Sequence, residues 1–436
     1  MEMSNCIFIC EFVSGGGFNK EQIPVSLFCE GFSMLRAICT DLKKIGFKII
    51  TLLDERISFL HELLPIDNFI ICSKNSEYVK LFKESISKSD YCYIIAPEFS
   101  NILLELTKLV IKAGKKLLNV NPKAIELATS KFSTYKYFLA NELSTPKTYI
   151  VPNHDNLPKK AFLIKKLKDL NSPIIVKPED GVGAEYIFYF ETKEDINQFY
   201  EDKVNFIEKD RSYILQEYIA GENLSLSLIG IENNKKSNIH PFILSFNAQN
   251  IRLTKNHNSS EYLGGYTPVD EDIDLSKIIR RDLKSMDLTN FVGYFGIDLI
   301  STNSYPMYIE INPRLTTSYL GIRNILKLNP AELILKSVTG EMHVDDLENN
   351  IQKNKTSVFK RLDLKYKGSS SQLEINERII SPLLERFPEF ITPPITFESN
   401  SNYSCFIATN EKTLRESNNK ILSIKRELEE MDFIIL

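Results

Sequence analysis

Short apolar runs alternate with amphipathic stretches over roughly the first 120 residues. Because helical spacing and short apolar runs alternate, this part of the chain predicts βαβ units and a parallel sheet covered on both faces. Such sheets bind ligands at the carboxyl ends of their strands, where Ser14-Gly15-Gly16-Gly17 follows the first run. The expected strands are Cys6–Phe12, Phe47–Leu53, Asn68–Cys72, Tyr91–Ala96 and Lys116–Asn119, and the expected helices are Glu30–Ile45, Ser76–Ser87 and Asn101–Ala113.

The middle of the chain predicts two further units. A helical stretch from Ala124 to Leu143 is interrupted near Thr129 and Ser130. Strands are then expected at Thr148–Val151, Pro173–Lys177, Glu185–Phe190 and Tyr213–Tyr218, with helices at Pro158–Leu170 and Thr192–Glu208. Beyond Gly221 strands dominate, at Leu224–Ile231, His240–Phe246, Gly293–Ser301 and Pro306–Ile311, and a helix is expected at Leu275–Phe291.

The last segment contains more turn signals and fewer regular patterns. Pro393-Pro394 is typical of a turn, the polar stretches 348–355 and 398–403 favour loops, and Glu411–Met431 is typical of a charged helix. The patterns together predict an α/β protein, α+β in its central part, with units at 1–122, 123–220, 221–345 and 346–436. The tail is open to two interpretations, a small α/β lid or an oligomerisation element.

Composition narrows the class of protein without naming it. The chain has 436 residues, 43% of them hydrophobic, and a net charge of −4, which gives no reason to expect nucleic acid as a partner. Its seven cysteines show no CxxC spacing, so buried thiols of a reducing cytoplasm are expected. The first residues are not typical of a signal peptide, so none is expected, and no apolar run is long enough to predict a membrane span.

A lysine and a glycine loop follow the apolar run at residues 173–176. Lys177 ends the predicted strand, and Gly181-Val182-Gly183-Ala184 comes directly after it. Glycines let backbone N–H groups approach phosphate oxygens, and lysine supplies a positive charge. The lysine precedes the glycines, so this is not a P-loop. Alone, the pattern is more often an ordinary turn than a phosphate site.

Three oxygen-bearing side chains and an arginine come together farther along. Glu310 and Asn312 share one face of a predicted strand, and Asp298 lies on the strand before it. Oxygen ligands of this kind suit magnesium, which also binds nucleotide phosphates. Arg314 follows, where its guanidinium could reach a transferring phosphoryl group. Taken alone, a half-solvated strand explains the pattern equally well.

The order of these pieces resembles the ATP-grasp superfamily over roughly residues 5–340. The resemblance implies ATP and Mg²⁺, with Mn²⁺ as an alternative ion, and an N-terminal pre-ATP-grasp domain with a parallel sheet. It implies metal binding by Asp298, Glu310 and Asn312 and catalysis by Lys177 and Arg314. The nucleotide site would comprise Lys131, Lys177, Gly181, Val182, Gly183, Ala184 and the strand-end hinge Gln216, Glu217, Tyr218 and Ile219. Asn223 stands where a ribose-binding glutamate is common, so the ribose contact stays open.

Shorter motifs narrow the resemblance. Phe8–Gly17, Leu27–Leu35 and Gly264–Pro268 resemble a subgroup that includes tyramine–L-glutamate ligase of methanofuran synthesis. This implies an amide bond formed between a carboxylate, with glutamate as a candidate, and an amine through an acyl phosphate. Ser14, Gly15, Gly16, Glu30 and Arg252 would then face these small-molecule substrates, with structural roles equally weighted. A carboxylase-type enzyme, a catalytically silent nucleotide-binding module and a homodimer stay open.

Overall fold

The computed structural model describes the chain with several gaps. The described residues are 5–154, 157–181, 186–202, 207, 211–233, 238–253, 260–270, 272–302, 305–342, 347, 354–368, 380–397 and 402–436. Three of the glycine-loop residues, Val182, Gly183 and Ala184, therefore lie outside them. In the described part of the chain, no helix is both long and apolar enough to cross a bilayer.

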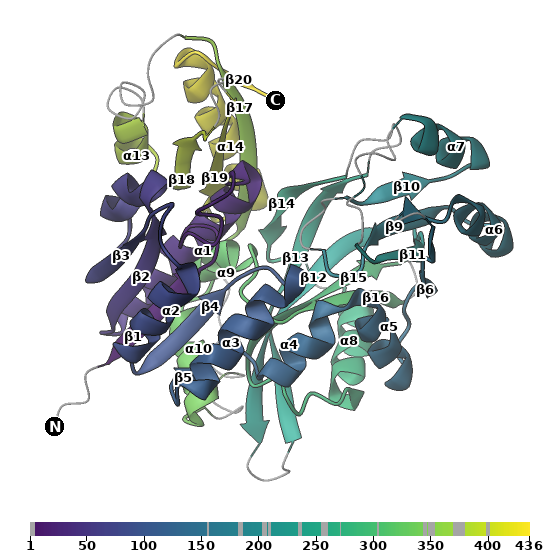
Figure 1. Cartoon of the computed structure of the whole chain (residues 1–436), viewed down its shortest axis with the longest axis horizontal. Helices are drawn as coiled ribbons and strands as arrows, with labels where there is room; N and C mark the ends of the chain where they lie inside the picture. The colour runs from purple at the N-terminus through teal and green to yellow at the C-terminus, as the bar shows by residue number, and fades with distance from the viewer. Residues whose placement is uncertain are drawn as a thin grey trace.

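The N-terminal unit is a parallel sheet with helices packed around it, as the alternating pattern predicts. Its strands lie in the order β3-β2-β1-β4-β5, and all neighbouring pairs are parallel. The chain leaves β1 toward β2 on one side and later reaches β4 on the other (Figure 1). The strands are β1 (Cys6–Glu11), β2 (Lys48–Asp54), β3 (Asn68–Cys72), β4 (Tyr91–Ile95) and β5 (Lys116–Leu117). The helices are α1 (Val25–Lys44), η1 (Glu55–Leu63), α2 (Tyr78–Ser87), η2 (Phe99–Asn101) and α3 (Ile102–Lys112).

Two short helices lead out of this unit. α4 (Pro122–Thr129) begins with Asn121, whose side chain accepts the Lys123 N–H. α5 (Lys131–Ala140) begins with Ser130, whose hydroxyl accepts the Ser133 N–H. Because Ser130 has an extended backbone that caps the second helix, the predicted interruption at Thr129 and Ser130 is confirmed.

The next unit is a small antiparallel sheet in the order β10-β9-β11-β6, with α6 and α7 beside it (Figure 1). Its apolar side chains form a hydrophobic cluster of their own. Its elements are β6 (Thr148–Ile150), α6 (Lys160–Leu170), β9 (Ile174–Pro178), β10 (Phe188–Phe190), α7 (Lys193–Asp202) and β11 (Tyr213–Glu217), and β7 (Asn153–His154) pairs with β8 (Leu157–Pro158) beside it.

A large sheet occupies the centre of the molecule. Its strands run in the order β16-β15-β12-β13-β14-β17-β19-β18, and β20 also pairs with β17. The first part contains β12 (Glu222–Asn233), β13 (Asn238–Arg252), β14 (Glu261–Thr267), β15 (Gly293–Ser301) and β16 (Pro306–Asn312). The accompanying helices are α8 (Ile273–Ser285), α9 (Tyr319–Ile325) and α10 (Pro330–Thr339).

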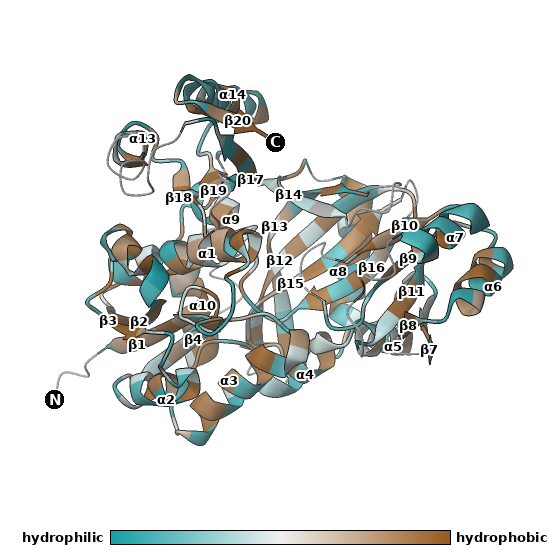
Figure 2. Cartoon of the chain, turned by 45° about the horizontal axis from the view of Figure 1, so that its top comes forward, coloured by the Kyte–Doolittle hydropathy of each residue, from teal (hydrophilic) through white to brown (hydrophobic). Residues whose placement is uncertain are grey.

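The C-terminal strands continue this sheet, because β14 pairs with β17. The tail comprises β17 (Ser357–Tyr366), α13 (Ser381–Arg386), β18 (Phe390–Ile395), β19 (Asn402–Ala408), α14 (Leu414–Glu430) and β20 (Phe433–Ile435). It has its own hydrophobic cluster, and Figure 1 shows it beside the N-terminal unit. Figure 2 shows brown, hydrophobic residues in β1, β2 and β4 and much teal on α7 and α14. The unit boundaries drawn from the sequence stay predictions.

Several expectations for the tail and the helices are wrong. Pro393 and Pro394 lie inside β18, which is tolerated because that strand ends the sheet, where proline's missing N–H breaks no ladder. Tyr403, expected in a loop, lies in β19. The helix expected at Leu275–Phe291 already ends at Ser285. Of the expected loop at 348–355, residues 348–353 lie outside the described residues.

Candidate active site

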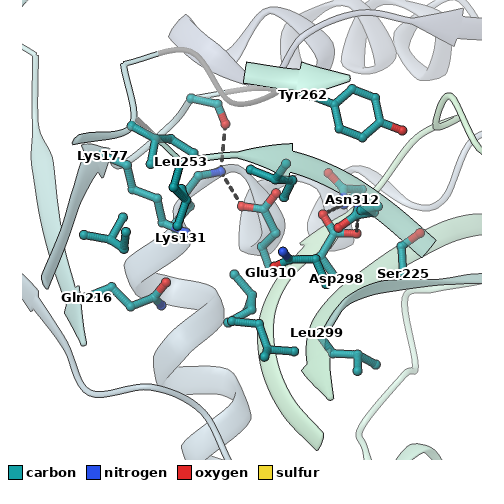
Figure 3. A pocket seen from close by; sticks show the side chains of 18 of the residues that line it. Lys131, Lys177, Gln216, Ser225, Leu253, Tyr262, Asp298, Leu299, Glu310 and Asn312 are labelled. Carbon is teal, nitrogen blue, oxygen red and sulfur yellow. Dashed lines mark hydrogen bonds and ion pairs between the residues drawn. The ribbon is translucent and has the colours of Figure 1, made fainter. Parts of the chain in front are cut away.

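A cavity of about 410 Å³ lies between the small sheet and the β12–β16 part of the large sheet. Side chains from α5, β9, β11, β13, β15 and β16 line it (Figure 3). The predicted residues that the structure brings to its wall are Glu30, Lys131, Lys177, Gly181, Gln216, Glu217, Tyr218, Ile219, Asn223, Asp298, Glu310, Asn312 and Arg314. Residues more than 280 positions apart in the sequence therefore share one cavity.

Lys131 connects the glycine-loop segment to the large sheet. It is the first residue of α5, and its backbone N–H donates to the Glu179 carbonyl. Its ammonium Nζ donates to the Gly181 carbonyl (2.7 Å) and lies 2.6 Å from Glu310 Oε2 (Figure 3). Ser130, which caps α5, donates to Glu179 Oε1 (2.5 Å). The lysine is thus held at the start of the loop by its own helix cap.

Lys177 is a buried cation on β9, and only 5% of its surface is exposed. Burial lowers the pKa of its ammonium to about 8; Glu310 acts against this lowering, and Lys131 adds to it. A buried ammonium is stabilised by any anion placed beside it. The cavity wall at Lys177 therefore favours a negatively charged ligand.

Asp298, Glu310 and Asn312 converge as the strand pattern predicts. β15 and β16 are antiparallel neighbours, and their register pairs Asp298 with Glu310 and Gly296 with Asn312. Asp298 accepts hydrogen bonds from Asn312 Nδ2 (3.1 Å) and from Gln249 Nε2 (3.0 Å). Two carboxylates and an amide thus present oxygen atoms to one part of the cavity.

The two carboxylates have opposite pKa shifts. Burial alone would raise the pKa of Glu310, but the ammonium groups of Lys131 and Lys177 outweigh burial and hold that pKa well below its usual range. Burial, and then the charge of Glu310, raises the pKa of Asp298. A cation between the two would favour the charged form of both.

The oxygen atoms of Asp298, Glu310 and Asn312 suit Mg²⁺, which prefers hard oxygen ligands and accepts phosphate oxygens as well. Among the described residues, no group of three His, Cys, Asp or Glu side chains is placed to hold a metal ion. The candidate set has two carboxylates and depends on Asn312 and on the ligand's own oxygens for the rest. It therefore fits an ion that arrives together with phosphate groups.

The strand-end hinge lines the cavity, although part of its backbone is already used. The Glu217 N–H donates to the Lys147 carbonyl, and the Tyr218 N–H donates to the Pro173 carbonyl. Gln216 donates from Nε2 to Thr148 Oγ1 (3.0 Å). An adenine edge would therefore have to be read by other backbone groups of this segment.

Arg314 lies just past β16 and is mostly buried, with 14% of its side chain exposed. Its Nε donates to Glu98 Oε1 (3.0 Å), and its Nη1 donates to the Leu315 carbonyl (3.1 Å). Glu98 follows β4 of the N-terminal sheet, and its other oxygen, Oε2, is buried without a hydrogen-bond partner among the described residues. The predicted catalytic arginine is thus held from the N-terminal unit.

Of the residues predicted to face the substrates, some line the cavity and others do not. Glu30, on α1, lines the cavity, and its Oε1 lies 3.7 Å from Arg361 Nη1 on β17. Ser14 is fully buried, and the Ser14–Gly16 turn packs on Glu11 and Cys72 rather than on the cavity. Arg252 is exposed, while its neighbours Ile251 and Leu253 line the cavity, as alternation along a strand requires.

Glu98 and Gln249 were not predicted as site residues from the sequence. Glu98 comes directly after the apolar run Tyr91–Pro97, at the carboxyl edge where ligands bind parallel sheets. That position was a usable signal. Gln249 offered none, because its contact with Asp298 depends on the neighbouring positions of β12, β13 and β15.

The chain resembles known proteins in sequence and in fold. A family model described as an ATP-grasp domain matches residues 128–318, and one described as a pre-ATP-grasp domain matches residues 47–125. The chain is 32% identical to the tyramine–L-glutamate ligase of Methanocaldococcus jannaschii over 77% of this chain and 90% of that protein. It is 31% identical to the Methanocaldococcus fervens enzyme of the same name, over 58% and 68%. The ADP complex of N5-carboxyaminoimidazole synthetase from Staphylococcus aureus has the same fold, with a TM-score of 0.62 and 16% identity over 99% of both chains.

Proposed function

Because this chain belongs to the ATP-grasp family, we propose that it is an ATP-dependent carboxylate–amine ligase that releases ADP and phosphate. Its proposed substrates are L-glutamate as the carboxylate and a primary amine, the classes to which the substrates named for its relatives belong. The observation that carries the proposal is the meeting of Lys131, Lys177 and Glu310 in one cavity.

Lys131 and Lys177 are proposed to hold the phosphates of ATP. An ammonium group has three donors, and Lys131 uses two of them for Gly181 and Glu310, which leaves one for a phosphate oxygen. Lys177 is buried nearby, so a phosphate oxygen would offset the cost of its burial. Gln216–Ile219 would lie along the adenine, and Asn223 is the candidate for the ribose.

Asp298, Glu310 and Asn312 are proposed to bind Mg²⁺ as its protein ligands. The ion, when bound, offsets negative charge on the phosphates and orients them. Gln249 donates to Asp298 and Asn312 donates to the same carboxylate, which fixes its orientation. The Lys131 ammonium forms an ion pair with Glu310, which orients this second carboxylate.

Arg314 is proposed to stabilise the charge that develops as the carboxylate of one substrate takes up the γ-phosphoryl group. Positioned donors of this kind stabilise transition states because they need no reorganisation during the reaction. Glu98 accepts a hydrogen bond from Nε of this guanidinium, and the Leu315 carbonyl accepts one from Nη1. These two contacts fix the orientation of the guanidinium. The amine would then attack the acyl phosphate and displace phosphate.

The proposed setting is the cytoplasm. The seven cysteines are free thiols, and all except Cys6 are buried, which supports a reducing compartment. A homodimer is part of the same proposal and is tested by sedimentation of the purified protein.

A coupled assay tests the proposed function. The protein is incubated with Mg-ATP and pairs drawn from a panel of amino acids and amines, and ADP, phosphate and product mass are measured. We expect ADP formation to require both a carboxylate and an amine. Glu310→Gln should lower the rate by about 100-fold or more, since it removes a charge at the phosphates. Glu222→Gln, at an exposed glutamate on β12, serves as the matched control.

Two outcomes would reject the proposal. Tight ATP binding without substrate-dependent ADP formation for any pair would favour a silent nucleotide-binding module. ADP formation that depends on bicarbonate and not on an amine would favour a carboxylase-type enzyme.

A further inference from the structure

A second, smaller cavity of about 50 Å³ adjoins the first, and the two share Glu30 and Arg314 in their walls. We propose that it binds the amine substrate, with an alkyl segment of the amine in the small cavity and the amine nitrogen at the junction beside Glu30 and Arg314. This inference rests on the proposed function, since it assigns a place to one of the two substrates.

The topology of the N-terminal sheet places this cavity where a ligand is expected. The chain adds β2 and β3 on one side of β1 and then β4 and β5 on the other side, so the order in which strands are added reverses between β1 and β4. Ligands of open parallel sheets bind outside the carboxyl ends of the strands at such a switch point. Glu11 ends β1 and Pro97 follows β4, and both line the small cavity.

The rest of the wall is apolar and comes from the β1 turn, α1 and β4. A volume of about 50 Å³ is well below the roughly 150 Å³ cavity that holds benzene, so it accommodates an alkyl segment rather than a whole ring. Gly31 lets α1 approach the Glu11 carboxylate closely at the cavity wall, because a β-carbon there would lie 2.5 Å from it. The apolar lining consists of Val13, Leu27, Met34, Ile95, Ala96 and Pro97.

The charges around the junction favour a cation over a second carboxylate. Glu11 and Glu30 face the small cavity, and Glu98 already pairs with Arg314. Arg361 lies behind Glu30, 3.7 Å from its Oε1. Asp363 pairs with Arg361 at 3.1 Å, so Glu30, Glu98 and Asp363 together stand against two guanidinium groups. A protonated amine at the junction therefore meets a complementary charge, and its nitrogen would lie next to the arginine assigned to phosphoryl transfer.

Calorimetry with n-butylamine as the probe tests the proposal in the presence of a non-hydrolysable ATP analogue and Mg²⁺. We expect wild type to bind n-butylamine and to bind neutral 1-butanol at least about 10-fold more weakly, because the ion pair with Glu30 is lost. Ala96→Val, which fills the small cavity, should weaken n-butylamine binding by about 10-fold or more, and Glu30→Gln by a similar factor. Ala37→Val adds the same methyl groups elsewhere in the core, at a residue that lines neither cavity, and should leave the affinity within about 2-fold.

Nucleotide affinity, measured on every variant, shows whether each one is folded. The proposal is overturned if wild type binds the nucleotide but no amine, if Ala96→Val binds n-butylamine as wild type does, or if Ala96→Val weakens binding of L-glutamate instead. The proposed function fails separately, when wild type forms no ADP with any carboxylate and amine pair of the panel. Amine binding with the expected variant effects would then still stand.

Discussion

Arg314 depends on a residue from another unit of the chain for its place at the site. Its Nε donates to Glu98 Oε1 at 3.0 Å, and both side chains are mostly buried. In such a pair each charge offsets the cost of burying the other. Glu98 therefore acts through Arg314 and is a positioning residue.

Glu98→Gln should separate turnover from nucleotide binding. The amide still accepts the Arg314 N–H but carries no charge, so the guanidinium is less firmly oriented. We expect kcat to fall about 10-fold while KM for ATP changes less than about 2-fold. Steady-state kinetics check this, with exposed Glu105→Gln as the control. If Glu98→Gln lowers kcat and the stability of the protein together, and KM for ATP changes as much as kcat, the role of Glu98 is purely structural.

Glu11 makes folding stability depend on pH. It is buried at the end of β1 and accepts the N–H groups of Val13 (3.1 Å) and Ser14 (2.7 Å). Burial raises the pKa of its carboxyl to about 7, although those hydrogen bonds and Arg314 act against the rise. The unfolded value is about 4.3, so the folded state holds the proton more tightly. Its stabilising contribution is therefore present below about pH 4 and is lost as the pH rises through about 7.

Denaturant titrations at pH 5 and pH 8 test this linkage. From pH 5 to pH 8, wild type should lose stability that Glu11→Gln keeps. The free energy of unfolding of the variant minus that of wild type should therefore be on the order of 2 kcal/mol larger at pH 8 than at pH 5. Comparing the two pH values removes the constant cost of the lost hydrogen bond. A difference between variant and wild type that does not change with pH would contradict the assignment.

At the scale of elements, α1 joins the active site to the C-terminal tail. Glu30 on this helix lines both cavities, and the same helix contacts β18 through Ser33 and Arg36. Thr392 Oγ1 lies 2.6 Å from Ser33 Oγ and donates to the Cys29 carbonyl at 2.9 Å. Arg36 Nη1 donates to the carbonyls of β18 residues Phe390 and Ile391. The tail therefore helps to hold the helix that carries Glu30.

Thr392→Val should destabilise the protein by about 1 to 3 kcal/mol, because it keeps the volume and leaves buried polar groups of α1 unpaired. Urea unfolding of Thr392→Val, Ser33→Ala and the double variant measures the effect. The double variant should lose less than the sum of the single variants. Strictly additive losses would show that the two hydroxyls do not interact.

The sequence predicted local elements well and left most long-range strand pairings open. Gly293–Ser301 and Asn68–Cys72 match their strands because each is apolar and bounded by turn residues. β14 was missed because Gly264 and Gly265 weaken a strand pattern. In the structure they are needed there, since a β-carbon at either would overlap backbone of Phe359 or Ala248. The lysines and oxygen ligands could be predicted from their order, whereas Glu98 and Gln249 depend on which strands become neighbours.

At the scale of the whole molecule, the cavity is built from parts with separate hydrophobic clusters. The small sheet has one cluster, the tail has another, and the N-terminal unit shares a third with the large sheet. Lys177 lies on the small sheet and Glu310 on the large one. A ligand that contacts both residues therefore links two sheets whose hydrophobic clusters are separate.

Mg-ATP should raise the thermal midpoint of unfolding, because it binds the folded chain only. When the concentration of Mg-ATP is 100 times its dissociation constant, the free energy of unfolding increases by about 2.7 kcal/mol. ATP with EDTA should give a clearly smaller gain, since Asp298 and Glu310 then face phosphate without a cation. Differential scanning fluorimetry measures both, and equal gains with and without magnesium would contradict the metal assignment.

The contact between α1 and β18 also has a consequence for synthesis on the ribosome. Arg36 and its β18 partners are 354 and 355 residues apart in the chain. At about 5 to 20 residues per second, α1 waits roughly 20 to 70 s for the strand that covers it. During that time Phe28, which packs at 5.0 Å against Phe397 in the finished protein, lacks that ring contact. The nascent chain should therefore be a client of chaperones that shield apolar helices until translation has passed β19.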